Sequence, residues 1–233
     1  MHVPNEEHIP GKPGRREEPD CFELISREEL DALSENRTHV SYLKGETLFK
    51  QGAFAPHVLF VQSGLVKVYL QFGPKKAQNL WIAKSGDFLA FSTMFGEKIY
   101  HYSAMALKDA EVLMIDKKSL RNLLKTNSEF GFRITSKNYR SENHLMEIVA
   151  NLSYKQMRGK LASALIYLSS EAFKYEDIFS YLSRQDIADF ASISVESVIK
   201  FLKEFEKEEI IGLENKQIKI LDSSRLGLIS TTG

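Results

Sequence analysis

Short runs of β-branched and aromatic residues, separated by turns that contain glycine, fill residues 38–115. The clearest runs are residues 58–61, 65–70, 80–82 and 112–115. Glycine accepts a positive φ at little cost, and the glycines at which we expect the chain to reverse are Gly45, Gly52, Gly64, Gly73 and Gly86. Because regularly spaced short strands are typical of sandwiches and barrels, the pattern predicts an antiparallel β sandwich or barrel.

Beyond Asp116 the apolar residues follow a helical period. Residues 129–152, which contain no proline, predict one long helix, and residues 158–172 predict another. The long helix carries an apolar stripe at spacings of three and four residues, made of Leu145, Ile148, Val149 and Leu152. Such a stripe packs either on a second copy of the chain or on the β domain of its own chain. We favour dimerisation, because a helix between two domains has little else to cover it.

Residues 183–221 carry the pattern of a winged helix-turn-helix. Ser183 suits the cap of a short helix, and Ser194, after a tight turn, suits the cap of a second helix that ends near Lys207. In the second helix we expect Val198, Phe201, Leu202 and Phe205 to face the core, and Val195, Glu196, Ile199, Lys200 and Lys203 to face outward. Residues 210–213 and 217–221 predict a hairpin wing. This pattern alone fits DNA binding, protein docking or a scaffold.

The predicted elements divide an α+β protein into four parts. Ser26 followed by Glu29 predicts a capping box and a short helix within residues 22–33, with a loop as the alternative. Residues 1–21 are rich in proline and charge and are expected to be flexible. The remaining parts are a sensor β-roll domain at 22–127, a dimerisation helix at 128–152 and a winged helix-turn-helix domain at 153–233.

Composition excludes several classes of protein. No apolar run is long enough to span a membrane or to form a signal peptide, so we expect a cytoplasmic protein with no membrane contact. The single cysteine, Cys21, cannot supply an iron–sulfur cluster or a structural zinc site. The sequence has no nucleophile-elbow, phosphate-loop or zinc-protease motif, so we expect no enzyme activity.

Net charge gives no support to nucleic-acid binding, because 31 basic residues balance 31 acidic ones. From Arg158 to the end of the chain, ten Lys and Arg residues stand against twelve Asp and Glu residues. Any DNA-binding surface must therefore arise from the local placement of charge.

Two sets of motifs in the same order resemble a known family. In the C-terminal half they are residues 183–187 (SRQDI) and 194–202 (SVESVIKFL), and in the β half residues 44–52 (KGETLFKQG), 61–68 (VQSGLVKV) and 86–88 (GDF). The chain resembles the CRP/FNR family of bacterial transcription regulators over nearly its whole length after Cys21. The resemblance implies that the β half is an antiparallel β-roll or jelly-roll of the cyclic-nucleotide-binding-like kind. Lys200 stands where that family usually has arginine.

The resemblance implies a homodimer, formed through residues 128–152, that binds double-stranded DNA at an inverted repeat. It places Glu196 and Lys200 at base edges, where the carboxylate accepts from cytosine and the ammonium group binds guanine or a phosphate. Val195 can contact only a thymine methyl or nothing. The expected DNA-binding residues are Ser183, Arg184, Gln185, Ser194, Val195, Glu196, Ser197 and Lys200. RNA polymerase is a further candidate partner. The alternative is a ligand-binding barrel with a winged helix that docks on protein and has no DNA function.

The resemblance also locates an effector pocket at Phe91, Ser92, Thr93, Tyr102 and Ser103. In relatives that bind cyclic AMP, a glutamate holds the ribose where Phe91 stands, and an arginine holds the phosphate where Tyr102 stands. We therefore expect that cyclic AMP is not the effector, since both charge-assisted contacts are lost. The aromatic side chains either fill the cavity, which we favour, or accept a planar ligand such as haem, with His57 or His101 as the iron ligand.

Overall fold

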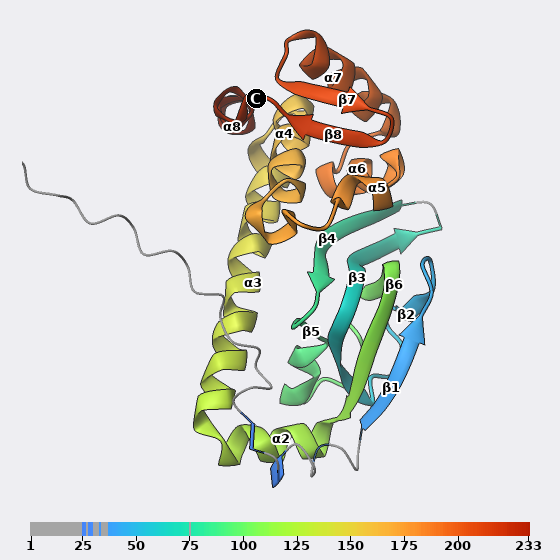
Figure 1. Ribbon diagram of the computed structural model, residues 1–233, viewed down its shortest axis with the longest axis vertical. Coiled ribbons are helices and arrows are strands. Elements are labelled where there is room, and N and C mark those ends of the chain that lie inside the picture. Colours follow the sequence, from blue (N-terminus) through green and yellow to red (C-terminus); the bar gives the residue numbers. More distant parts are fainter. Residues whose placement is uncertain (1–24, 27, 30–32, 34–36, 75) are drawn as a thin grey trace, which may run out of the picture.

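The computed structural model describes residues 25–26, 28–29, 33, 37–74 and 76–233, and its N-terminal half is an antiparallel sheet (Figure 1). The predicted flexible segment at 1–21 lies outside these residues. The strands are β1 (Arg37–Tyr42), β2 (Thr47–Phe49), β3 (His57–Gly73), β4 (Lys76–Lys84), β5 (Phe88–Leu89) and β6 (Ser103–Asp116). Their order is β1-β6-β3-β4, with β2 paired to β6 and β5 paired to β3. A 3-10 helix, η2 (Phe91–Phe95), follows β5. The predicted α+β fold with an N-terminal antiparallel sheet is confirmed.

The prediction that the chain reverses at Gly64 is wrong. The runs 58–61 and 65–70 belong to one strand, β3, and Gly64 lies inside it with a φ of +89°. The register with β6 shifts between Ser63 and Leu65, so the glycine occupies a β-bulge. Both a tight turn and a bulge of this kind can require a residue with positive φ, and glycine adopts it cheaply in either setting. A glycine in the sequence therefore does not distinguish a turn from a bulge.

A long helix follows the sheet and lies along it (Figure 1). This helix is α3 (Ser128–Tyr154), which α2 (Lys117–Thr126) precedes. The predicted helix at 129–152 is confirmed. Leu145 and Ile148 pack against the core of the sheet, whereas Val149 is 58% exposed and Leu152 is 40% exposed. The apolar stripe is therefore divided between the chain's own β domain and solvent.

The C-terminal half is a helical domain with a small hairpin. Its elements are α4 (Met157–Leu168), η3 (Glu171–Phe173), α5 (Ile178–Tyr181), α6 (Arg184–Ala191), α7 (Val195–Lys207), β7 (Ile211–Glu214), β8 (Gln217–Ile220) and α8 (Ser223–Thr232). The helix expected at 158–172 ends earlier, at Leu168. Ser169 donates its hydroxyl to the Leu165 carbonyl at 2.7 Å, and such local bonding competes with helix continuation.

The short helix expected within residues 22–33 is confirmed where the structure describes the chain. Glu28, Glu29 and Leu33 are helical. The Ser26 N–H donates to Glu29 Oε2 at 2.9 Å, and the Glu29 N–H donates to Ser26 Oγ at 3.2 Å, which is the predicted capping box. Among the described helices, none is both long and apolar enough to cross a membrane.

Candidate functional site

The first helix of the helix-turn-helix begins at a capping box that the sequence predicts. The Asp186 N–H donates to Ser183 Oγ at 3.0 Å, and the Ser183 N–H donates to Asp186 Oδ2 at 2.8 Å. Gln185 is exposed and donates to Asp189 Oδ1 at 2.8 Å. Arg184 is half-buried, and burial lowers the pKa of its guanidinium group. Ser183 and Gln185 thus lie at the exposed N-terminal end of α6.

The second helix, α7, presents one buried face and one exposed face. Ser194 caps it by accepting the Ser197 N–H at 3.2 Å. The core face consists of Val198, Leu202 and Phe205, which are buried, and Phe201, which is half-buried. The exposed side chains are Glu196, Ile199, Lys200 and Lys203, as predicted. Val195 differs from the prediction because it is only half exposed and packs against the core of its own domain.

The charged groups at the N-terminal end of α7 are accessible to a ligand. Hydrogen bonds from its own backbone N–H and from the Ser194 side chain lower the pKa of Glu196, so this carboxylate is ionised at neutral pH. The Lys200 side chain is 69% exposed, and its Nζ lies 4.0 Å from Glu204 Oε1. An exposed ion pair of this length contributes little stability, so Lys200 can exchange Glu204 for another anion. The wing, β7 and β8, adds exposed Lys216 and Lys219.

The sheet also contacts the first helix directly, a contact that the sequence did not predict. Lys67 Nζ of β3 lies 2.5 Å from Asp186 Oδ1, and the two side chains are 13% and 14% exposed. Asn79 of β4 donates to the Asp186 carbonyl at 3.0 Å, and Ser192 donates to the side chain of Gln78. Figure 1 shows the end of the β3–β4 hairpin beneath α5 and α6. Burial acts to raise the pKa of Asp186, but the charge of Lys67 and the hydrogen bonds from Lys67 and Ser183 outweigh it, and the pKa is lowered.

Two of the expected effector residues, Thr93 and Tyr102, form hydrogen bonds with the backbone of Ala90, and Ser103 bonds to another backbone group. The Ala90 N–H donates to the Tyr102 hydroxyl at 2.6 Å, and Thr93 Oγ1 donates to the Ala90 carbonyl at 2.7 Å. Ser103 Oγ accepts the Gln51 N–H at 3.0 Å. Phe91 is buried, whereas Ser92 is exposed and does not join the group.

Aromatic rings complete the interior of this site. The ring of Tyr102 lies 5.1 Å from Trp81 and 5.7 Å from Phe49 between centroids, and Phe49 stacks on Tyr100 at 4.0 Å. Burial raises the pKa of Tyr102 to about 12, so its hydroxyl is neutral near pH 7. The site offers a cyclic phosphate no positive charge from these residues.

The two candidate iron ligands lie at the start of β3 and just before β6. His101 is half-exposed, and its Nε2 lies 3.2 Å from Glu97 Oε2. His57 begins β3, in register with Asp116 of β6. Among the described residues, no group of three His, Cys, Asp or Glu side chains could hold a metal ion. Aromatic side chains fill the interior beside these strands.

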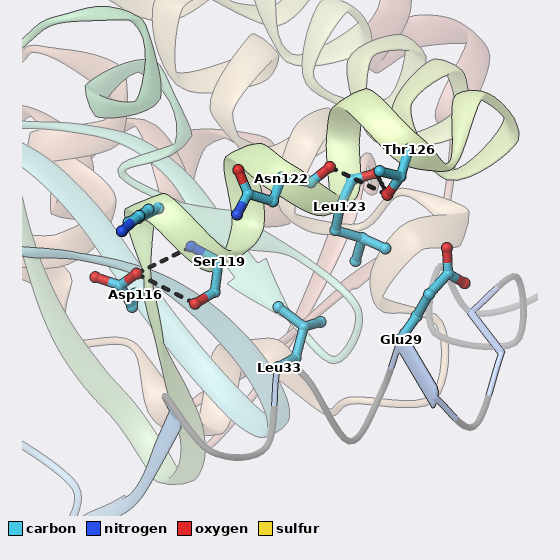
Figure 2. A pocket seen from close by; sticks show the side chains of 8 residues that line it. Glu29, Leu33, Asp116, Ser119, Asn122, Leu123 and Thr126 are labelled. Atoms are coloured by element: carbon cyan, nitrogen blue, oxygen red, sulfur yellow. Dashed lines mark hydrogen bonds between the residues drawn. The ribbon is translucent and has the colours of Figure 1, made fainter.

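A cavity of about 410 Å³ lies elsewhere, between the N-terminal helical residues and α2 (Figure 2). It is lined by Glu29, Leu33, Asp116, Lys118, Ser119, Asn122, Leu123 and Thr126. Asp116 accepts the backbone N–H of Ser119 at 2.9 Å and thereby caps α2. Glu29 accepts from Asn127 at 3.1 Å and from Ser26. The two carboxylates of this cavity, Asp116 and Glu29, therefore already accept hydrogen bonds at the N-terminal ends of helices.

Comparison with known proteins matches two separate parts of the chain to known domains. A model described as "Cyclic nucleotide-binding domain" matches residues 39–127, and one described as "Crp-like helix-turn-helix domain" matches residues 159–229. The anaerobic regulatory protein of Bacillus subtilis is 30% identical over 204 residues, which is 84% of each chain. The transcriptional activator protein Anr of Pseudomonas protegens is 28% identical over 217 residues, 89% of this chain and 87% of Anr. A mutant of CooA from Carboxydothermus hydrogenoformans has the same fold, with a TM-score of 0.76 at 22% identity over 92% of this chain and 97% of CooA.

Proposed function

The chain belongs to the CRP/FNR family of DNA-binding transcription regulators, and from this premise we propose that it acts as a homodimer on an inverted-repeat DNA site. The observation that carries the proposal is the structure of α7, whose apolar face is buried while Glu196 and Lys200 stand exposed near its capped N-terminus. In a helix-turn-helix protein the N-terminal residues of the second helix contact base edges in the major groove. Two such helices about 34 Å apart match one turn of DNA.

The proposed contacts fall into two groups. Ser183, Arg184, Gln185, Ser194 and Ser197 lie at the N-terminal ends of α6 and α7, where hydroxyl, amide and guanidinium groups donate to phosphates. Glu196 and Lys200 read bases, and Val195 contributes less because its own domain covers part of it. In this proposal 22–127 is the sensor, 128–152 the dimerisation helix and 153–233 the DNA-binding domain. RNA polymerase is a further proposed partner.

Specific base contacts by Glu196 and Lys200 can be tested by selecting bound DNA from a random pool at a stated salt concentration. We expect an inverted repeat to be enriched. Glu196→Ala and Lys200→Ala should each weaken binding to that site by about 10- to 100-fold per half-site, because a base contact is worth about 1–3 kcal/mol. Glu206→Ala, on the exposed C-terminal part of α7, is the matched control and should bind like the natural protein. An unenriched pool, with or without added small molecules, would contradict the proposed readout and favour protein docking.

The dimer interface that we propose is the exposed side of α3. Met146 is 70% exposed and Val149 is 58% exposed, one turn apart on the helix. Leu152 extends this apolar strip by three residues. Leu145 and Ile148, by contrast, already pack against the sheet, so the helix can use both faces at once. Met146, Val149 and Leu152 follow one another at spacings of three residues, and a second parallel helix can cover such an apolar strip.

Replacing Val149 with aspartate should dissociate the dimer. The change places a charge in the centre of the strip, and burying an unpaired carboxylate costs several kcal/mol. Sedimentation or light scattering at micromolar concentration should give a mass about half that of the natural dimer. Glu147→Lys, also exposed on α3 but turned away from Val149, should remain a dimer. A Val149→Asp protein that stays dimeric would place the interface elsewhere.

We propose further that neither cyclic AMP nor haem is the effector. Tyr102 occupies the phosphate position with a neutral hydroxyl that already accepts a backbone N–H, and Phe91 supplies no acceptor for a ribose. The stacked rings of Phe49 and Tyr100, with the tilted ring of Tyr102 beside Phe49, supply the packing that a ligand would otherwise provide.

A further inference from the structure

Ile199 is an apolar side chain on the part of α7 that faces DNA. It is 44% exposed, although Val198 beside it is fully buried and Leu202 is 2% exposed. A helix turn places it on the same face as Glu196, three residues before it, and Lys203, four residues after it. Single exposed apolar residues are common on protein surfaces, but this one shares a helix face with Glu196, which is proposed to contact a base.

The fold of the domain does not require an isoleucine at this position. The core face of α7 consists of Val198, Phe201, Leu202 and Phe205, and the wing and α4 pack on that face. Ile199 lies outside this core cluster. A β-branched residue is also a poorer helix former than alanine or lysine. Its apolar character is therefore available for a contact outside the chain.

We propose that Ile199 reads the methyl group of a thymine in the major groove, and this inference rests on the proposed binding of α7 to base edges. The groove edges of guanine, cytosine and adenine present hydrogen-bonding groups, and only thymine adds an apolar methyl. An aliphatic side chain placed over one of the other bases removes water from a polar edge and gives no hydrogen bond in return. Thymine is the base that an isoleucine fits.

The geometry also gives the position of this thymine. Residues three apart on a helix are separated by about 4.5 Å along its axis, and base pairs are about 3.4 Å apart. The thymine should therefore lie roughly one base step from the pair that Glu196 contacts. Val195 was the sequence-based candidate for a methyl contact, but it packs against its own domain, and Ile199 is the more accessible aliphatic group.

Uracil substitution tests the inference, because uracil pairs like thymine and lacks only the 5-methyl group. The probe is the operator selected by the natural protein, with its thymines replaced by uracil one at a time in both half-sites. At one position uracil should weaken binding by about fourfold per half-site, the value of one buried methyl group. Ile199→Ala should bind the thymine and uracil operators equally at that position. Glu206→Ala, the exposed control on the C-terminal part of the same helix, should still distinguish them.

The possible results distinguish a failure of the inference about Ile199 from a failure of the proposed DNA binding. If the natural protein selects an inverted repeat but tolerates uracil at every position, Ile199 does not read a methyl group. The same conclusion follows if Ile199→Ala keeps the full sensitivity to uracil. If no DNA sequence is enriched at all, the proposed readout by α7 fails before the question of Ile199 arises.

Discussion

Replacing Gly64 with alanine should destabilise the β domain by about 3 kcal/mol, because the site combines an unfavourable backbone conformation with a steric clash. Gly64 has a φ of +89°, in the left-handed region. A Cβ atom there would lie 2.3 Å from the Asp109 carbonyl oxygen and 2.6 Å from Ala110 Cα of the neighbouring strand. Both atoms belong to backbone, so the strands themselves must move apart.

Gly52 is the matched control for the clash. Its φ is +82°, but an added Cβ would meet nothing within 4 Å. Gly52→Ala should cost only about 1 kcal/mol. In thermal unfolding at one protein concentration, Gly64→Ala should lower Tm by roughly 6–12 °C and Gly52→Ala by roughly 2–4 °C. Equal shifts for the two variants would show that backbone conformation alone, without contact across the bulge, decides the cost.

The parts of the fold that the sequence predicts best are those set by neighbouring residues. The caps at Ser183 and Ser194 and the two faces of α7 follow from hydrogen bonds and periodicity within a few residues. The long helix was predicted to within two residues at each end, Ser128–Tyr154 against 129–152. A capped helix carries the signals for its start and its end in its own sequence, so its bounds can be predicted without knowledge of the tertiary packing.

The bulge at Gly64 and the division of the stripe on α3 could not be predicted in the same way. Whether a glycine lies in a turn or in a bulge depends on the partner strand, here β6, which follows about 40 residues later. Leu145 and Val149 both belong to the same stripe, and only the position of the sheet decides that the first is covered and the second is exposed.

Local sequence patterns predict only part of the candidate site as well. The motif identified Glu196, Lys200 and their neighbours because these residues are close together in the sequence. The contact between sheet and first helix joins Lys67 and Asp186, which are 119 residues apart. No local pattern distinguishes this lysine from an exposed one. The sequence led us to expect that the long helix connects the two domains, and the structure adds a second, direct connection.

Replacing Lys67 with methionine should release α6 from the sheet. The ion pair with Asp186 is nearly buried, and removing one partner of such a pair costs about 3–5 kcal/mol because the other charge remains without compensation. The interface also contains hydrogen bonds from Asn79 and Ser192 and apolar packing of Leu65 and Ile82 against the C-terminal core. Among the described residues, the buried Asn79 Oδ1 has no hydrogen-bond partner, which weakens this interface. We expect faster amide hydrogen exchange in α6 and in the β3–β4 hairpin, with the centre of the sheet unchanged.

Acid should also weaken the contact between α6 and the sheet in the natural protein. The pKa of Asp186 is held below its ordinary value of 3.8, so the carboxylate stabilises the folded contact above that value, and the stabilisation is lost as the pH falls through the lowered pKa. In Lys67→Met the burial remains without the cation, so the pKa of Asp186 in the closed contact should rise. Protonation at low pH removes the uncompensated buried charge, so acid should strengthen the contact in this variant, whereas it weakens the contact in the natural protein.

The double variant Lys67→Met with Asp186→Asn separates a lost charge pair from a lost fold. Asparagine keeps an oxygen that can accept the Ser183 N–H, so the capping box of α6 can survive. Removing both charges also removes the uncompensated one, and replacing a whole buried pair is often nearly neutral. We therefore expect the double variant to recover most of the hydrogen-exchange protection that Lys67→Met loses. If Lys67→Met keeps its protection from hydrogen exchange, apolar packing of Leu65 and Ile82 against the C-terminal core holds the domains together. The ion pair would then contribute little to the stability of the contact.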